Sequence, residues 1–304
     1  NISWHSIRLP LQTLLPSLAL VGAVLFWGGS FPAAKAALAV LSPEAVMWSR
    51  MALAMIVLIP FLNKLRPRTY RRGDWRPLVA MMVFMPCAYF FLESNALTLT
   101  TASQAGVISS SVPLLVALGA RMFLSEPLSP RVLAGMALSI GGVAWLTLAG
   151  TPQENAPNPL LGNMLEFGAM ISAAGYMLIV KRLSDRYGPW TLTMLQTGAG
   201  LLFFLPGAPE VVTTAPALPL PIIIALIFLG TCVTLGAFGL YNWALSKLPA
   251  SAAATSINMV PVAAVFFGWV LLGETLNSEQ FLASICVLTG VFITQRRRKN
   301  EMRA

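Results

Sequence analysis

A succession of long apolar segments, almost free of charged side chains, constrains this chain more than any other feature. A helix of about 20 apolar residues spans the hydrocarbon core of a bilayer. Only 10% of the residues are charged, against about 25% in a typical soluble domain, and the deficit extends along the whole chain. The sequence therefore predicts an all-α membrane protein with ten spans at residues 13–39, 44–63, 77–98, 101–123, 130–149, 160–181, 188–207, 219–245, 249–272 and 277–295.

The basic residues predict how these spans are oriented. Ten spans place both ends of the chain on one side of the membrane. If that side is the cytoplasm, the cytoplasmic segments, including a basic tail at 296–304, hold 18 of the 20 Lys and Arg residues. The opposite loops contain glutamates but no Lys or Arg, as the positive-inside rule requires. The net charge of +9 therefore indicates a bilayer and no nucleic acid as the partner, and we expect a bacterial inner membrane.

Residues that carry metal, nucleophilic or nucleotide chemistry are sparse. Cys87, Cys232 and Cys286 each lie inside an apolar run, and the single histidine, His5, lies in the N-terminal tail. This excludes an HExxH-type metal site, and the sequence contains neither a Gly-x-Ser-x-Gly motif nor a Walker A motif. We therefore expect no metal, no cofactor and no ATP-driven step.

The two halves of the sequence match each other. With a gap-free shift of 148 residues, Val112-Pro113 falls on Val260-Pro261 and Glu126 falls on Glu274. A shift of 146 places Lys35 on Lys181. The sequence therefore predicts two five-helix units, at residues 13–149 and 160–295. Because each unit has an odd number of helices, the second enters the membrane inverted, and inverted repeats are typical of secondary transporters.

One pattern occurs once in each unit: a helix of small residues, a central proline, an apolar run that ends in Glu-x-Leu, and a glycine-rich closing helix. The two copies are ALTLTTASQAGVISSSVPLLVALGARMFLSEPLSPRVLAGMALSIGGV and ALSKLPASAAATSINMVPVAAVFFGWVLLGETLNSEQFLASICVLTGV. Both resemble the second half of an EamA domain, the repeat unit of the drug/metabolite transporter superfamily. The resemblance covers essentially the whole chain, and it implies transport of a small molecule without naming the substrate.

Lys35 lies in an apolar run, WGGSFPAAKAAL, where a charged side chain costs about 2.5–3.5 kcal/mol on insertion scales. Two glycines and Pro32 weaken the local hydrogen-bond ladder, so we expect a bent or locally opened helix with Pro32 as a candidate hinge. Trp27, Phe31 and Lys35 share one helical face. Two roles stay open: Lys35 lines a ligand-sized cavity with these rings, or it snorkels to water at the outer end of the span.

Arg50 is the second cation within a span, and it keeps its proton at physiological pH. Glu93 and Glu166 lie at a similar depth, in the outer half of the bilayer. Two interpretations stay open for Arg50: a structural salt bridge with Glu93, or a role in substrate binding. A carboxyl group in this position is also able to exchange a proton during a transport cycle, so Glu93 and Glu166 are candidate proton-coupling residues.

Further polar and aromatic side chains complete the predicted substrate path. Gln196 and Tyr241 are the repeat-mates of Arg50 and Glu93. Pro113 and Pro261 lie at matching places and are candidate hinges or simple kinks. Glu126 and Glu274, at span ends, are expected to cap or pin a helix end. The remaining substrate-binding candidates are Gln104, Tyr176, Asn242 and Asn258.

These observations favour a secondary active transporter over the alternatives. Two cations and two carboxylates within the spans favour a zwitterionic or anionic organic solute, such as an amino acid, exported by proton antiport or exchange. An intramembrane enzyme would need a nucleophile with a base, or a metal site. A channel would explain the apolar helices but not the inverted duplication. The sequence does not indicate the substrate, the coupling ion or the oligomeric state.

Overall fold

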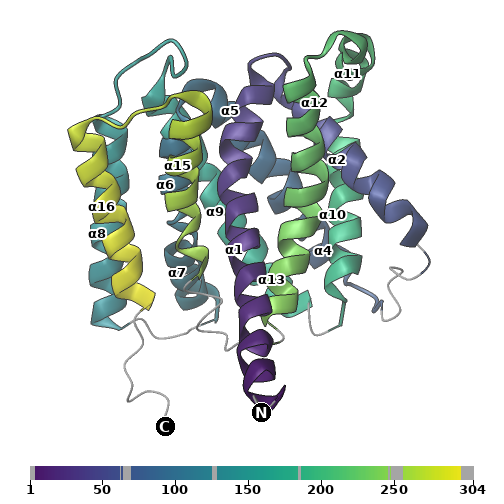
Figure 1. The fold of residues 1–304 in the computed structure, drawn as a ribbon, viewed down its shortest axis with the longest axis horizontal. Helices are drawn as coiled ribbons and strands as arrows, with labels where there is room; N and C mark the ends of the chain where they lie inside the picture. Colours follow the sequence, from purple (N-terminus) through teal and green to yellow (C-terminus); the bar gives the residue numbers. More distant parts are fainter. Residues whose placement is uncertain are drawn as a thin grey trace.

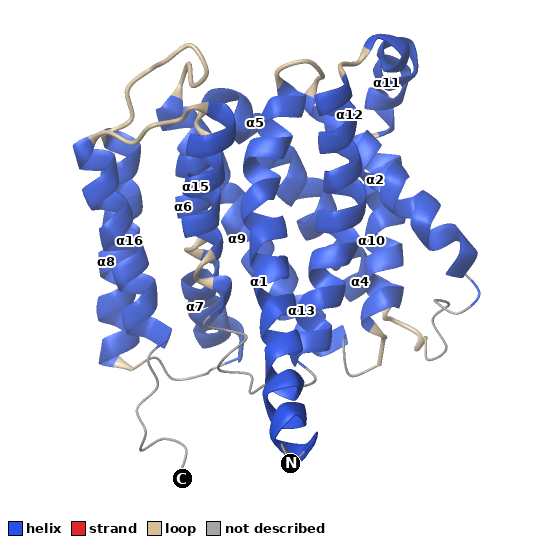
Figure 2. Ribbon diagram, in the orientation of Figure 1, coloured by secondary structure: helices blue, strands red, loops and turns tan. Residues whose placement is uncertain are grey.

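A computed structural model gives the fold of the chain and describes residues 4–61, 63, 70–124, 129–183, 186–245, 247 and 256–295. Helices account for nearly all of these residues outside the connections, and the described part contains no strand (Figure 2). The start of α1 and the end of α16 lie at the same end of the bundle (Figure 1). We call this the basal end and the opposite one the distal end.

In the first half, several predicted spans consist of more than one helix. The third predicted span contains two α-helices joined by a π-helical stretch, and the fourth contains two helices separated by a turn. The elements are α1 (Trp4–Leu38), α2 (Pro43–Leu58), α4 (Trp75–Met82), η2 (Val83–Ala88), α5 (Tyr89–Leu99), α6 (Ala102–Ser109), α7 (Val112–Leu124) and α8 (Pro130–Leu148).

The second half repeats this order with its own interruption. A π-helical stretch again lies inside the third span of the unit. The elements are α9 (Pro159–Leu183), α10 (Pro189–Phe203), η3 (Leu205–Gly207), α11 (Ala208–Thr214), α12 (Leu220–Ile227), η5 (Phe228–Ala237), α13 (Phe238–Leu245), α15 (Val260–Leu272) and α16 (Ser278–Gln295).

The helices have the length and composition of membrane spans. Seven described helices are long and apolar enough to cross a bilayer, and an eighth is obtained if the bent pair at 189–203 and 205–217, which meets at 56°, counts as one span. α15 and α16 are shorter apolar helices. Large apolar side chains such as Phe123, Leu202 and Trp269 are exposed on the outside of the bundle, as lipid contact requires. The chain is therefore an all-α, multi-pass membrane protein.

Local sequence signals set the helix boundaries. Ser42 caps α2, and its hydroxyl oxygen accepts a hydrogen bond from the Ala45 amide at 3.3 Å, ahead of a proline in the first turn. Thr101 and Ser129 cap α6 and α8 in the same way. Gly273 ends α15 with a φ of 65°, a left-handed conformation that glycine adopts without steric cost.

Corresponding helices of the two halves run in opposite directions. The end of α1 meets the end of α5, because the Lys35 ammonium group donates to the Leu97 carbonyl at 2.8 Å. The start of α9 lies at the same place, where the Asn158 amide donates to the Leu99 carbonyl at 3.2 Å. α1 and α9 are the first helices of their halves and are therefore antiparallel, as the inverted duplication predicts.

Small residues allow close contact between the halves. A methyl group added at Gly28 of α1 would overlap the Ala263 side chain of α15, and one added at Gly106 of α6 would overlap the Ala264 methyl. At the edge of the bundle beside α6 and α15, α8 and α16 pack as a pair (Figure 1), with Gly142 against the Val287 amide and Gly290 against Ser139. Close approach at small residues is the usual means of helix association in membranes.

The prolines behave differently from one another. α1 is helical throughout, so the helix is not opened at Pro32, and the bend and the hinge role expected there stay predictions. Pro113 and Pro261 each lie in the first turn of a helix, α7 and α15, directly after a turn, where a missing N–H costs no helical hydrogen bond. The interruption that matters for the site is at η2, where Met85, the residue before Pro86, leaves the helical conformation with φ −146° and ψ 120°.

Candidate functional site

Three charged residues of the sequence analysis lie in the same region of the interior. Arg50 is on α2, Glu93 on α5 and Glu166 on α9, and their exposed fractions are 6%, 5% and 0%. The electrostatic interaction of Glu93 with both of the other groups places the three charges near one another. Ionisable side chains buried within membrane spans are costly and usually functional. We call Arg50, Glu93 and Glu166, with their direct contacts Tyr89, Phe90 and Thr234, the central cluster.

The Arg50 guanidinium group is held on one side only. Its Nε donates to the Thr234 hydroxyl oxygen at 2.9 Å, and its central carbon lies 4.3 Å from the centre of the Phe90 ring. The Thr234 hydroxyl in turn donates to the Leu229 carbonyl at 2.8 Å. Arginine has five N–H donors. Within the described chain, the terminal nitrogens of Arg50 make no hydrogen bond, so this planar fork is available to a bidentate anion such as a carboxylate.

The two carboxyl groups differ in their contacts. Glu93 Oε1 accepts a hydrogen bond from the Tyr89 hydroxyl at 2.6 Å. Neither oxygen of Glu166 has a hydrogen-bond partner among the described residues. No ion pair within 4.0 Å joins Arg50 to Glu93 in the described structure, so the direct salt bridge that the sequence left open is absent there. A buried carboxyl group without a partner is unfavourable unless a proton or a ligand satisfies it.

A second polar contact occupies the equivalent place in the other half. Gln196 of α10 donates from Nε2 to the Met85 carbonyl at 3.2 Å, and its Oε1 accepts from the Tyr176 hydroxyl at 3.4 Å. Ser172 of α9 donates to the neighbouring Phe84 carbonyl at 2.9 Å. These carbonyls are accessible because the helix is interrupted at η2. Gln196 is the repeat-mate of Arg50, and each of the two residues contacts the interrupted third span of the opposite half.

Lys35 contacts backbone carbonyls at the distal end of the bundle. Its ammonium group donates to the carbonyl oxygens of Leu97, Thr100 and Asn155 at 2.8, 2.5 and 2.7 Å. These three bonds use all the donors of a lysine. Leu97 is in the last turn of α5, where carbonyls lack helical partners and a positive charge is favourable. The structure thus adds a third role to the two left open by the sequence: Lys35 caps α5 and ties it to the loop before α9.

The distal end also confirms the capping role predicted for Glu274. Its carboxylate accepts from the amides of Ala102 and Ser103, each at 2.8 Å, and from the Ser103 hydroxyl at 2.7 Å, so it caps the start of α6. Nearby, the side-chain amide of Asn163 donates to Gln104 Oε1 at 2.8 Å. Gln104, a predicted substrate-binding residue, is thus bonded to the start of α9. The matching residue Glu126 lies outside the described residues.

The described contacts of the remaining candidates do not include the charged residues of the central cluster, and Phe31 belongs to the same apolar core as Phe90. Trp27 packs against the aromatic rings of Phe238 and Tyr241 on α13, at centroid distances of 5.4 and 5.5 Å. Phe31 is 5% exposed and belongs to the apolar core. Asn258 lies in the turn before α15. Asn242 is on α13, and its side chain is outside the described part. The assignment of these residues to a substrate path stays a prediction.

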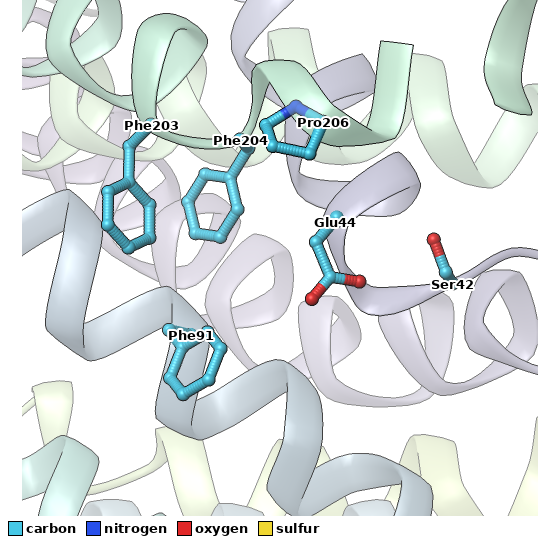
Figure 3. A pocket seen from close by; sticks show the side chains of 6 residues that line it. All are labelled: Ser42, Glu44, Phe91, Phe203, Phe204 and Pro206. Carbon is cyan, nitrogen blue, oxygen red and sulfur yellow. The ribbon is translucent and has the colours of Figure 1, made fainter. Parts of the chain in front are cut away.

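An open pocket of about 380 Å³ lies between the start of α2, α5 and the end of α10. Its lining residues are Ser42, Glu44, Phe91, Phe203, Phe204 and Pro206. Figure 3 shows the Glu44 carboxyl group between the phenylalanine rings on one side and Ser42 on the other. The pocket lies toward the distal end, where α2 begins and α10 ends, and none of its lining residues belongs to the central cluster.

Sequence reasoning missed Tyr89, Phe90 and Thr234. Tyr89 and Phe90 lie four and three residues before Glu93, so they share its helical neighbourhood, and that spacing was a usable signal. Thr234 had no such signal, because its contact with Arg50 spans 184 positions of the sequence. Its place opposite Arg50 depends on the packing of α2 against η5.

Fold and site together define an integral membrane protein with two inverted helical repeats and a polar cluster between them. The sequence matches the EamA-like transporter family twice, over residues 14–148 and 160–296. The chain belongs to this family. Its family and its relatives indicate a transporter of small molecules across a lipid bilayer rather than an enzyme.

Several known proteins are similar to the chain. An uncharacterized transporter of Bacillus subtilis, YetK, is 30% identical over 66% of this chain, and the match spans 62% of that relative's length. An uncharacterized transporter of Archaeoglobus fulgidus is 27% identical over 92% of this chain and 99% of its own. A "probable terminal-alkyne amino-acid exporter" of Streptantibioticus cattleyicolor is 24% identical over 94% and 95%. One solved crystal structure shares the fold, with a TM-score of 0.57 and 18% identity over 91% of this chain and 95% of that chain.

Proposed function

We propose that the protein is a secondary active exporter of small zwitterionic or anionic metabolites, amino-acid-like in charge, that works by alternating access. It has ten spans in two inverted five-helix repeats, its termini face the cytoplasm, and it resides in a bacterial inner membrane. The single observation that carries this proposal is the central cluster. There, the terminal nitrogens of a buried arginine make no hydrogen bond to any described residue, next to two buried carboxyl groups.

The chemistry of the cluster supports a zwitterion. The terminal nitrogens of Arg50 match a carboxylate in geometry and charge. The carboxyl groups of Glu93 and Glu166 match an ammonium group, and the adjacent rings of Tyr89 and Phe90 provide an apolar wall. The relative from Streptantibioticus cattleyicolor is named as an amino-acid exporter, which agrees with this substrate class and with export as the direction.

Energy coupling is proposed for the two carboxyl groups. Glu166 has no hydrogen-bond partner among the described residues, so a proton and a substrate ammonium group are alternative ways to satisfy the same site. Binding of one displaces the other, which is the requirement for proton antiport. Glu93, which accepts a hydrogen bond from the Tyr89 hydroxyl, is the second candidate for the same role. Exchange of one solute for another uses the same alternation without a proton.

The test is counterflow in proteoliposomes. Proteoliposomes that contain the purified protein are loaded with an excess of unlabelled amino acid. We then measure the accumulation of three kinds of labelled solute: zwitterionic amino acids, their carboxamides, and the corresponding acids without an amino group. We expect accumulation of at least one zwitterion, weaker accumulation of its carboxamide, and loss of this preference in Arg50→Gln. Glu154→Gln, at an exposed loop position, is the control. Equal transport of acids and carboxamides by the wild-type protein would contradict the proposal.

A further inference from the structure

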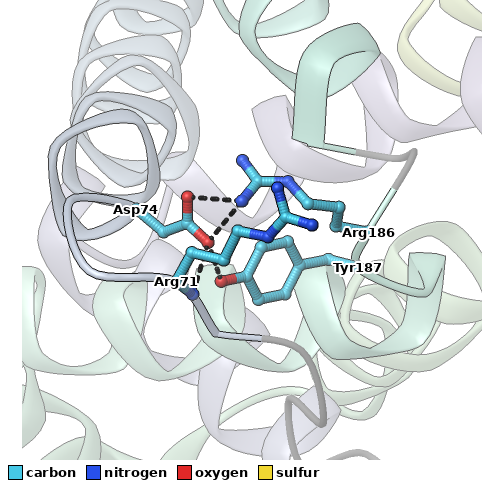
Figure 4. A network of polar contacts seen from close by, with 4 residues as sticks. All are labelled: Arg71, Asp74, Arg186 and Tyr187. Carbon is cyan, nitrogen blue, oxygen red and sulfur yellow. Dashed lines mark hydrogen bonds and ion pairs between the residues drawn. The ribbon is translucent and has the colours of Figure 1, made fainter.

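At the basal end, Asp74 joins the two halves of the molecule. Asp74 precedes α4, in the connection between the second and third spans of the first half. Its carboxylate accepts from Arg186 Nη1 at 2.8 and 2.9 Å and from the Tyr187 hydroxyl at 2.8 Å, and both donors lie in the connection between α9 and α10 (Figure 4). The Arg71 amide completes the set at 2.9 Å. We call this group the basal contact.

The basal contact is well enclosed for a group outside the spans. Asp74 is 6% exposed and Tyr187 is 2% exposed. The hydrogen bonds to Asp74, first that from the Arg71 amide and then those from Tyr187 and Arg186, hold the pKa of its carboxyl group below the usual range, although burial acts in the opposite direction. Burial, together with the bond to this carboxylate, raises the pKa of Tyr187 to about 12. The contact is therefore intact across the physiological pH range.

At the distal end, Glu210 makes the corresponding connection. Glu210 is on α11, in the connection between the second and third spans of the second half. Its carboxylate accepts from the Ser42 amide at 2.9 Å and from the Ser42 hydroxyl group. Ser42 is the residue before α2, in the connection between the first and second spans of the first half. We call this the distal contact.

The two contacts have the same topology, with the roles of the two halves exchanged. In each, a carboxylate between the second and third spans of one half binds the connection between the first and second spans of the other half. The shift of 146 that aligns the repeats places Ser42 on Gly188, next to Tyr187. The carboxylates themselves are not aligned, because Glu210 falls on Lys64 and Asp74 on Leu220 under the same shift. The same kind of connection is thus made by different residues at the two ends of the bundle.

We propose that the basal and distal contacts are two opposed latches that decide which end of the bundle opens. Each latch holds the halves together at its own end. Access from the basal end requires release of Asp74 while Glu210 stays bound, and access from the distal end requires the reverse. In the basal latch two residues of the other half, Arg186 and Tyr187, donate to Asp74, and one of them forms an ion pair with it, whereas in the distal latch Ser42 alone donates to Glu210.

The latches rest on the alternating access of the proposed function, and a labelling experiment separates the two claims. Cys87 in η2 is a native reporter, partly buried, in the middle of the third span. With Cys232 and Cys286 replaced by serine, its reaction rate with a membrane-impermeant maleimide is measured from each side of oriented vesicles. No substrate is needed, so the ratio of the two rates reports on the latches even if every transport assay is negative.

The two latch variants have opposite predicted effects. Asp74→Asn is expected to raise the ratio of basal to distal labelling about tenfold, the effect of losing one charge-assisted hydrogen bond. Glu210→Gln is expected to lower that ratio, by a smaller factor. Tyr187→Phe removes one hydrogen bond and no charge, so it shifts the ratio in the Asp74→Asn direction and keeps the test valid if Asp74→Asn fails to fold. Glu279→Gln, at an exposed acidic position, is the matched control.

The outcomes are exclusive. Opposite shifts for Asp74→Asn and Glu210→Gln support the latches. A ratio that is unchanged in both, or that moves in the same direction in both, overturns them, even if counterflow shows active transport. Absence of counterflow for every solute together with opposite labelling shifts would instead count against the proposed substrate class and leave the latches standing.

Discussion

Arg50 and Gln196 occupy equivalent positions in the two halves, yet they carry different chemistry. Both lie on the second span of their unit, and both reach the interrupted third span of the opposite unit. Arg50 binds a threonine hydroxyl and keeps its terminal nitrogens unbonded within the described chain, next to two carboxyl groups. Gln196 binds a backbone carbonyl and a tyrosine hydroxyl, so both ends of its amide are engaged.

The comparison indicates that the two repeats share the contact with the opposite half at this position but not its charge. The neutral amide of Gln196 is suited to joining helices, since its partners satisfy it within the protein. The guanidinium group of Arg50 is suited to binding a ligand, since most of its donors are unused among the described residues. In the first repeat this position thus carries the charged side chain of Arg50, and in the second repeat Gln196 keeps the same geometry in neutral form. The predictions below test this division of roles.

The largest effect on transport is expected when Arg50 is replaced by glutamine, the residue at the equivalent position of the second half. Arg50→Gln should lower transport of a carboxylate-bearing substrate about 100-fold, because two charge-assisted hydrogen bonds are lost. Gln196→Ala, the matched variant in the other half, should lower it only a few-fold through helix packing. Initial rates of counterflow at equal protein content measure both. Equal losses in the two variants would show that the halves share the role.

Glu166→Gln should separate coupling from exchange. The amide cannot take up and release a proton, so transport driven by a pH gradient should fall to the background level while solute exchange continues. Uptake with and without an imposed gradient, recorded between pH 5 and pH 8, measures this. Glu93→Gln should give a weaker effect, because Tyr89 already bonds that carboxyl group. An unchanged pH profile in both variants would remove these residues from coupling.

Thr234→Val should weaken substrate binding by about tenfold, because the valine cannot hold Arg50 Nε and the guanidinium fork loses its orientation. The loss should appear in KM rather than in the maximal rate, and Thr234→Ser should restore binding. Thr231→Val, a neighbouring threonine whose hydroxyl bonds only its own helix and Cys232 among the described residues, is the control. A fall in the maximal rate alone would assign Thr234 to the conformational change instead.

Lys35→Met should reduce stability rather than transport. Three carbonyls lose their donor, and an unsatisfied buried polar group costs about 1–3 kcal/mol. Unfolding followed in detergent measures the change. Lys181→Met, the repeat-mate at an exposed position of α9, is the comparison and should cost less. Loss of transport by Lys35→Met with unchanged stability would restore the cavity role for this lysine.

The smallest effect concerns the pH dependence of stability at the basal contact. The pKa of Asp74 is lower in the folded protein than its ordinary value, so the unfolded chain binds the proton more tightly. The stabilisation by Asp74 is therefore fully present above about pH 4, the ordinary range of an aspartate, and is lost as the pH falls through the lower folded value. The difference in melting temperature between wild type and Asp74→Asn should be largest at neutral pH and shrink in acid. A difference that persists in acid would contradict this assignment.

Much of the fold was predictable from the sequence because the membrane restricts the choices. The length of the apolar runs indicated the helices. The odd number of helices in each repeat indicated that α1 and α9 are antiparallel. The interruption at η2 was not predicted, although Pro86 lies inside it, since a proline inside an apolar run is compatible with a kink as well as a break. Pro32, by contrast, does not interrupt α1, which stays helical through it.

The charged residues of the site could be predicted from the sequence, but the residues that contact them could not. Arg50, Glu93 and Glu166 stand out because charged residues are rare within spans. Lys35 stands out for the same reason, yet its partners are backbone carbonyls, which no residue pattern identifies. Thr234 and Phe90 are ordinary residues of apolar helices, and their relation to Arg50 depends on how α2, α5 and η5 pack. Tertiary geometry thus distinguishes a charge that binds backbone from one that faces a ligand.

The methyl group of Ala264 has a broader consequence. It lies against Gly106 of α6, and the methyl group of the preceding residue, Ala263, lies against Gly28 of α1. Sliding any of these three helices past the others would first have to lift them apart. In the alternating access that we propose, we therefore expect this crossing point to stay in place and displacement to grow with distance from it toward both faces of the membrane.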